Sequence, residues 1–428
     1  MVANKLNELP ASKIAIGIAA GEFTAADVMR GCLDRIEERE GSLSAWAHVD
    51  PDLAMAAARV KDRVPPRGAL HGVPIGVKDV IDTNDFPTEM GSPIYRGQLP
   101  HGDAACIAQL RAAGAIVLGK TVTCEFAGMT PGPTRNPLDP ERTPGGSSSG
   151  SAAAVADHMV PIALGTQTRG SILRPASFCG IVGYKPSYGL VARQGLKFAA
   201  ESFDTIGVLV RTIDDAELSA SVLFGADRSK MQARSSPPSI GICFDGIERA
   251  EDASKKALED ALASLGVAGT KLRPFIFPHE VEEFTAATKI INDVERARAM
   301  AWEWRTKPEL ISERMRATIE EGLRTSPETY SASLRLMEDC RARLEAGFEG
   351  VDVILAPCVN GEAPVGLNHT GDPFFQGLWT ALHVPTISVP SHVGPNGLPV
   401  SIQLVGRKYE DEALLSAARW VLDVVRSH

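Results

Sequence analysis

The residues best suited to chemistry gather between Thr143 and Gly183. The first part of this stretch, residues 145–151, reads GGSSSGS and is too rich in glycine and serine for the interior of a helix or strand. A flexible linker has this composition, yet this one runs straight into a predicted small-residue helix (152–156) and a buried strand (160–164). It also lacks the Gly-Lys-Ser/Thr ending of a phosphate-binding loop. The pattern favours a tight loop that presents hydroxyl groups at the start of a helix.

The second part, GTQTRGS at 165–171, follows that strand and is predicted to turn sharply. Gly170 before Ser171 lets successive backbone N–H groups converge, which is how an oxyanion hole is made. A serine beside such donors is a candidate nucleophile, and it needs a base. No histidine lies within about ten residues of Ser171 in the sequence, and a more distant one stays open. Lys78 ends the apolar run GVPIGVKD at 72–79 and is another candidate, although a lysine there is more often a simple charge at a strand end.

Composition and charge exclude several classes of function. The 428 residues include 44 Lys and Arg against 53 Asp and Glu, a net charge of −9, and no basic stripe, so we expect no direct contact with nucleic acid. No apolar run is long enough to span a membrane and no export signal begins the chain, which predicts a cytoplasmic protein without membrane contact. The seven cysteines and nine histidines are scattered, so neither a disulfide framework nor a metal site is expected.

The elements that must position these residues alternate between strands and helices. Apolar runs at 73–80 and 116–119 flank a helical stretch at 104–113, and further strands are predicted at 351–356, 385–389 and 401–406. Thr24 is a predicted N-cap within the helical region 10–40, and a last amphipathic helix covers 411–425. The alternation predicts an α/β fold with a central mixed or largely parallel twisted sheet, covered by helices on both faces.

The chain is predicted to form one domain over residues 1–428. The region from about 225 to 349 differs in composition: it opens with the polar stretch 227–238 and continues with charged helical patterns at 281–304 and 329–348. We interpret this region as a helical covering inserted between core strands.

Together these motifs resemble the amidase signature family, whose members hydrolyse amides with a Ser-Ser-Lys triad. The resemblance spans almost the whole chain, and the order and spacing of the motifs make it specific. The motifs are GVPIGVKD (72–79), GAIVLGKT (114–121), PGGSSSGSAAAVA (144–156), GTQTRGS (165–171), CGIVGYKPSYG (179–189) and GLPVSIQLVG (397–406).

The resemblance implies a role for each matching position. Lys78 matches the basic lysine, Ser147 the bridging serine after a cis peptide, and Ser171, 24 residues further on, the nucleophile that carries the acyl group. The N–H groups of Thr168, Arg169, Gly170 and Ser171 match the oxyanion loop. The resemblance implies no metal or organic cofactor, and it leads us to expect a homodimer.

The sequence departs from the family pattern at positions that bear on specificity. Many members have Asp and Gly where this chain has Gln167 and Arg169, and the arginine after the nucleophile, Arg174, lies one place later than usual. Arg169 is predicted to meet an anionic group of the substrate, unless its guanidinium points into an ion pair elsewhere. The pocket walls are expected from the helical region and from loops near Met129 and Trp379.

These observations predict a hydrolase that cleaves the C–N bond of a small amide through an acyl-serine and releases ammonia or an amine. The alternatives are the amidase subunit of a glutamine-dependent tRNA amidotransferase, or a urea or carbamate hydrolase of the same family. A catalytically silent binding or assembly protein is a further class, but it would require the Lys78, Ser147 and Ser171 set to be intact by accident.

Overall fold

A computed structural model of the chain describes residues 5–231, 234 and 236–427. Its centre is one eleven-stranded sheet in the order β1-β3-β2-β4-β6-β5-β10-β11-β9-β7-β8. The strands are β1 (Trp46–Val49), β2 (Pro74–Lys78), β3 (Ile116–Thr121), β4 (Ile162–Gln167), β5 (Val182–Lys185), β6 (Thr205–Val210), β7 (Ser239–Cys243), β8 (Lys271–Phe275), β9 (Val353–Pro357), β10 (Thr386–Val393) and β11 (Pro399–Gly406).

The sheet is mixed, as the sequence predicts, but antiparallel pairs outnumber parallel ones. The strands β3, β2 and β4 are parallel, and so are β9, β7 and β8. The middle of the sheet, from β4 through β6, β5, β10 and β11 to β9, is antiparallel, and β1 also runs antiparallel to β3. Short connections make such pairs possible, for example the turn that joins β10 to β11, in which Gly397 has a φ of 79°.

Helices cover both faces of the sheet, as expected for this fold class. The helices α5 and α6 pack on each other and on one face, whereas α7, α8 and α14 pack together on the other. Thr24 caps α2 through a capping box with Asp27, as predicted. The helices are α1 (Ala11–Ala20), α2 (Ala25–Leu43), α3 (Pro51–Asp62), α4 (Ala105–Ala112), α5 (Ser149–Ala156), α6 (Leu173–Phe178), α7 (Ile213–Phe224), α8 (Asp252–Val267), α9 (Val281–Ala299), α10 (Ala301–Thr306), α11 (Glu313–Arg324), α12 (Pro327–Gly347), α13 (Phe374–Ala381) and α14 (Asp411–Arg426).

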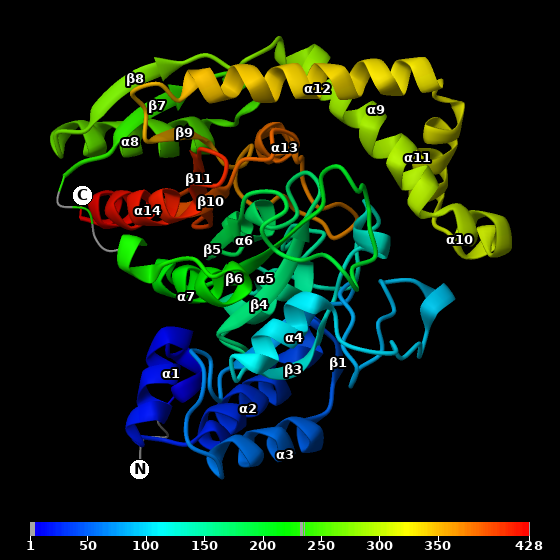
Figure 1. The fold of residues 1–428 in the computed structure, drawn as a ribbon, viewed down its shortest axis with the longest axis vertical. Coiled ribbons are helices and arrows are strands. Elements are labelled where there is room, and N and C mark those ends of the chain that lie inside the picture. Colours follow the sequence, from blue (N-terminus) through cyan, green and yellow to red (C-terminus); the bar gives the residue numbers. More distant parts are fainter. Residues whose placement is uncertain (1–4, 232–233, 235, 428) are drawn as a thin grey trace.

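The region between 225 and 349 is not purely helical, which differs from the sequence interpretation. It contributes β7 and β8 to the sheet, next to β9, before α9, α11 and α12 arch over the upper part of the molecule (Figure 1). The strand β8 is hard to find in the sequence because it lies at the sheet edge and four of its five residues are not buried. The polar stretch 227–238 includes residues 232, 233 and 235, which lie outside the described residues.

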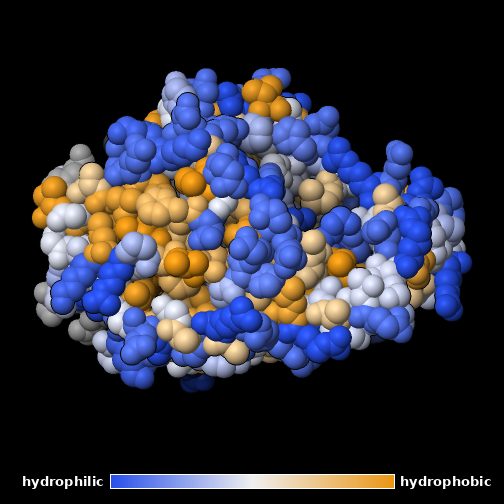
Figure 2. Space-filling model, turned by 90° about the horizontal axis from the view of Figure 1, so that it is seen from above, coloured by the Kyte–Doolittle hydropathy of each residue, from blue (hydrophilic) through white to orange (hydrophobic). Residues whose placement is uncertain are grey.

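The surface over α12 and β8 mixes polar and apolar side chains, with apolar atoms gathered toward one side of the view (Figure 2). Across the described ranges, no helix combines the length and the apolar character that crossing a bilayer requires.

Candidate active site

Lys78 lies at the end of β2 and is fully buried. Its Nζ is 2.7 Å from Ser147 Oγ and 2.8 Å from Thr166 Oγ1, a residue of the neighbouring strand β4. Burial penalises the ammonium form and lowers the pKa of Lys78 to about 7. A substantial fraction of the amine is therefore neutral near pH 7 and able to accept a proton.

Ser147 follows a cis peptide bond after Gly146, in the loop that leads into α5. Glycine is required at 146, because a Cβ there would lie 2.7 Å from Thr370 Cγ2 and 3.0 Å from Cys124 Sγ. The carbonyl of Ser147 accepts a hydrogen bond from the N–H of Cys124 at 3.2 Å. The loop is thus pressed against its surroundings on both sides and cannot act as a flexible linker.

The other serines of this loop tie it to β4. Ser148 Oγ accepts the N–H of Thr166 at 3.3 Å, and Ser151 Oγ donates to the carbonyl of Leu164 at 2.9 Å. These bonds hold the start of α5 against the strand that leads to Ser171.

The loop after β4 is organised by the side chain of Gln167. Its Oε1 accepts the N–H groups of Ile172 at 2.8 Å and Leu173 at 3.1 Å, and its Nε2 donates to Thr380 Oγ1 at 2.9 Å. The carboxamide of Gln167 therefore bridges the start and the end of the turn and also anchors the turn to α13. This explains how glutamine serves at a position where many family members carry aspartate.

The turn itself leaves its backbone donors free. Within the described part of the chain, the N–H groups of Arg169, Gly170 and Ser171 donate to no protein acceptor, whereas the Arg169 carbonyl accepts from Thr380 Oγ1 at 2.7 Å. A Cβ at Gly170 would lie 2.3 Å from Gln376 Oε1, so only glycine fits this backbone path. Free N–H groups at a fixed turn are suited to stabilising a developing oxyanion. Thr168, the first residue of the predicted oxyanion loop, is held by a 2.5 Å bond from its Oγ1 to Asp204.

Ser171 lies next to the loop that carries Ser147 and lines a cavity. Its carbonyl accepts the N–H of Ser148 at 3.4 Å, which brings the two loops together. No hydrogen bond joins the side chains of Ser147 and Ser171 in the residues that the structure describes, and Ser171 lines the cavity with 8% of its surface exposed. The structure thus joins Lys78 to Ser147 directly and places Ser171 in the adjoining loop, at the cavity.

The cavity has a volume of about 60 Å³ and is bounded by the oxyanion loop, α6, α9, α11 and the loop after η3 (Glu125–Ala127). Met129 lines it, as the sequence suggests. Trp379 does not: this side chain is buried in α13 and packs against Phe275 and Phe277, because its large apolar ring contributes more in the core than at a polar cavity. The remaining lining residues are Ala127, Gly128, Thr168, Arg169, Gly170, Ser171, Arg174, Asn292, Arg296, Arg314, Met315, Thr318 and Pro373.

Three residues of this site escaped the sequence interpretation. Thr166 belongs to a recognised motif, and its hydroxyl contact to Lys78 could have been suspected from that position. Arg296 and Arg314 come from α9 and α11 in the covering region, where no motif marks them. No group of three or more His, Cys, Asp or Glu side chains in the described ranges is arranged to hold a metal ion.

Comparisons with known proteins agree with this fold and motif set. The Amidase family model matches residues 27–415. The glutamyl-tRNA(Gln) amidotransferase A-subunit of Anaeromyxobacter sp. (strain K) is 33% identical over 473 aligned residues, covering 97% of this chain and 96% of that protein.

Solved structures show the same similarity. One described as a crystal structure of an amidase shares 30% identity at a TM-score of 0.88, covering 96% of this chain and 99% of the other. An inhibitor-bound vestigial protein complex, described as revealing the origins of an s-triazine catabolic enzyme, shares 26% identity at a TM-score of 0.89, covering 97% and 98%. The chain belongs to the amidase family and is a hydrolase that acts on carbon–nitrogen bonds.

Proposed function

We propose that this protein hydrolyses the C–N bond of a small amide through a triad of Ser171, Ser147 and Lys78. The observation that carries the proposal is the 2.7 Å contact between Lys78 Nζ and Ser147 Oγ, at a lysine whose pKa burial lowers to about 7. A neutral lysine bonded to a serine is a base that needs no histidine.

Acylation begins when Ser171 Oγ attacks the amide carbonyl. Its proton passes to Ser147 Oγ as the Ser147 proton passes to Lys78 Nζ, and the free N–H groups of the oxyanion loop stabilise the tetrahedral oxyanion. The relay then runs in reverse and protonates the departing nitrogen. The C–N bond breaks, ammonia or an amine leaves, and the acyl group stays on Ser171.

Deacylation uses the same residues with water in place of the amine. Lys78, again neutral, accepts a proton from the water through Ser147, and the resulting hydroxide attacks the acyl carbonyl. Collapse of the second tetrahedral intermediate returns the proton to Ser171 and releases the carboxylic acid. The protein residues named here supply every proton transfer in the cycle.

Covalent labelling tests the proposed nucleophile. A fluorophosphonate should add one phosphonyl group to the protein, and peptide mass spectrometry should place it on Ser171. The Ser171→Ala variant should keep its circular dichroism spectrum, lose the label and lose amide turnover. A label on another residue, or turnover retained in the variant, would rule out the assignment and return a silent assembly protein or another nucleophile to consideration.

The amidase subunit of a glutamine-dependent tRNA amidotransferase is the second candidate, and the names of the curated relatives favour it. Eight of them, 30–33% identical over 96–97% of this chain, are named as that subunit. The word subunit implies a protein partner for those relatives. Glutaminase activity measured for this chain by itself, and again with candidate partner subunits, separates the two functions.

Two further features stay predictions within this proposal. Homodimerisation can be measured by sedimentation at micromolar concentration. Urea-like compounds and carbamates also carry a carbonyl bonded to nitrogen, so a substrate panel scored for ammonia and amine release should include both.

A further inference from the structure

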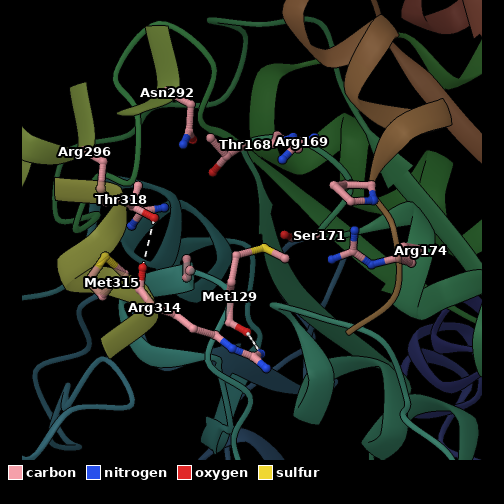
Figure 3. A pocket seen from close by; sticks show the side chains of 14 residues that line it. Met129, Thr168, Arg169, Ser171, Arg174, Asn292, Arg296, Arg314, Met315 and Thr318 are labelled. Carbon is pink, nitrogen blue, oxygen red and sulfur yellow. Dashed lines mark hydrogen bonds between the residues drawn. The ribbon is translucent and has the colours of Figure 1, made fainter. Parts of the chain in front are cut away.

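Four arginines line the cavity together with Ser171. Arg169 comes from the oxyanion loop, Arg174 from α6, Arg296 from α9 and Arg314 from α11, so four separate segments supply them (Figure 3). No aspartate or glutamate is among the cavity's lining residues in the described part of the chain. The site therefore concentrates positive charge at the point where the amide must bind.

These arginines differ from arginines that are paired with acidic residues elsewhere in the protein. Arg111 contacts two carboxylates and so does Arg419, whereas none of the four cavity arginines has a carboxylate within 4.0 Å in the described ranges. Arg174 Nε and Nη1 and Arg296 Nε are buried and without any hydrogen-bond partner there. Unpaired buried guanidinium donors are costly, and an anionic ligand would satisfy them.

The carboxylates nearest this cluster are already engaged. Asp204 accepts bonds from Thr168 and from the N–H of Ala199, and Asp293 is paired with Lys289. Asp372, which precedes the lining residue Pro373, is exposed and accepts the N–H of Phe374. These carboxylates act on the cavity arginines only from a distance, Asp372 and Asp293 on Arg169 among them, and direct pairing is left to a ligand.

Arg169 is the least engaged of the four, and it lines both this cavity and a smaller one between α9 and α13. Its guanidinium makes no hydrogen bond or ion pair within the described residues, although burial lowers its pKa. Arg174 is instead tied to the Gly146 carbonyl at 2.6 Å, and Arg314 to the Asn368 carbonyl at 2.8 Å. The alternative considered from the sequence, an ion pair of Arg169 elsewhere, is therefore not what the structure has.

We propose that the cavity selects a small amide that carries a carboxylate and no ammonium group, and that Arg169 binds this carboxylate through paired N–H donors. The inference deepens the proposed function and rests on it. A guanidinium fork matches a carboxylate in a bidentate arrangement. A free ammonium, as in glutamine, would meet four cations and no acidic partner in the cavity, which should weaken its binding.

The size of the cavity limits the substrate further. A space of about 60 Å³ has room for only a few small groups. Short dicarboxylic acid monoamides fit this description better than long-chain or aromatic amides. Malonamate, succinamate and glutaramate are therefore the probes, with propionamide, butyramide and pentanamide as neutral counterparts and asparagine and glutamine as zwitterions.

The kinetic experiment compares kcat/KM for these three groups of amides. We expect at least one monoamide to exceed its neutral counterpart roughly 10- to 100-fold, the range for hydrogen bonds to a charged group, and to exceed its zwitterionic analogue as well. Arg169→Gln should remove that preference mainly through KM, so that the charged and neutral amides are hydrolysed with similar kcat/KM. Arg169→Lys should restore only part of it. Arg298 is an exposed arginine of α9 that lies over Tyr330, and Arg298→Gln is the control. This control should leave kcat/KM unchanged for all three groups of amides.

Calorimetric binding to the Ser171→Ala variant gives a readout that does not depend on turnover. Succinamate should bind at least about tenfold more tightly than butyramide, and the difference should vanish with Arg169→Gln. Equal binding of the charged and neutral amides, or tighter binding of asparagine or glutamine, overturns the inference even where hydrolysis through Ser171 is intact. The protein could instead bind succinamate tightly while the unaltered protein hydrolyses none of the amides. That result would count against the proposed hydrolysis but would leave the inferred selectivity for a carboxylate in place.

Discussion

The carboxamide oxygen of Gln167 accepts the N–H of Ile172 at 2.8 Å and so closes the turn that carries Ser171. The same side chain reaches Thr380 of α13 with its Nε2 at 2.9 Å. One buried side chain thus determines the path of the backbone from Thr168 to Ser171. The direction of the free N–H groups therefore depends on a residue whose own side chain does not line the cavity.

Gln167→Ala should impair catalysis more than binding. The change leaves the buried N–H groups of Ile172 and Leu173 without an acceptor, which costs about 1–3 kcal/mol for each unsatisfied group. The turn should relax and misplace the oxyanion donors, so kcat should fall by about 10²-fold while KM changes little. Gln167→Glu keeps an acceptor oxygen and should retain more activity than the alanine variant. Equal kcat values for the two variants would contradict this role.

Gly170→Ala tests whether the turn tolerates a side chain. The added Cβ would lie 2.3 Å from Gln376 Oε1, and Gln376 is fully buried with its amide bonded to the Cys358 carbonyl, so it has little room to move. We expect a fall in kcat of about 10²-fold, since a displaced oxyanion donor costs that much.

Gly41→Ala is the matched control for this substitution. A Cβ at Gly41 in α2 meets nothing within 4 Å, so alanine should leave activity unchanged and slightly stabilise the helix. Steady-state kinetics and urea unfolding of both variants check the pair. Unchanged kcat in Gly170→Ala would mean that the turn is not held as closely as its contacts indicate.

The parts of the site that could be predicted are those encoded in contiguous motifs. Lys78 ends a buried strand, and Ser147 and Ser171 stand in loops whose glycines are needed to avoid collisions with the surrounding side chains. The glycine-rich composition of these loops can be recognised in the sequence, because residues with a side chain do not fit at those glycine positions. The alternation of strands and helices gave the α/β class for the same reason, since period and turn residues are local properties.

The parts that could not be predicted depend on distant segments meeting in space. Arg296 and Arg314 stand on amphipathic helices where charged residues are common, and only tertiary packing brings them to Ser171. Trp379 was wrongly expected at the cavity because an aromatic residue near a site and one in the core look alike in sequence. The edge strand β8 lacks the apolar run by which buried strands are found.

The buried pair of Lys120 and Asp79 should contribute to stability without taking part in the reaction. Lys120 Nζ lies 3.1 Å from Asp79 Oδ1, and both side chains are almost fully buried. Lys120→Met leaves the carboxylate without its counter-charge and should lower the free energy of unfolding by about 3–5 kcal/mol. Adding Asp79→Asn should recover part of this loss because the uncompensated charge disappears.

Urea unfolding of the two variants measures this coupling. Lys256→Met removes an exposed pair with Asp260 and is the control, which should leave the unfolding midpoint almost unchanged. A double variant no more stable than Lys120→Met alone would show that the charge pairing is not the source of the effect.

Lys78 is expected to set the acidic limb of the pH profile. Burial lowers the pKa of its amine from 10.5 to about 7, so the neutral form that accepts protons grows as the pH rises through 7. The value of kcat/KM should therefore rise along a limb with an apparent pKa near 7, far below that of a free lysine. Lys78→Ala should remove the limb and most of the activity. Lys78→Arg should not restore them, because arginine stays charged across the working range.

The same titration should appear in stability, which gives a second check on Lys78. Between pH 7 and 10.5 the unfolded chain holds a proton on this lysine that the folded protein has released, so the free energy of unfolding should rise with pH across that window. In Lys78→Met this rise should be smaller, and below pH 7 the variant should be more stable relative to the unaltered protein, because no ammonium has to be buried. No histidine lines the cavity in the described residues, so a histidine base would have to reach Ser171 through other residues. An unchanged limb in Lys78→Ala, together with an unchanged slope of stability in Lys78→Met, would assign the base to such a residue instead.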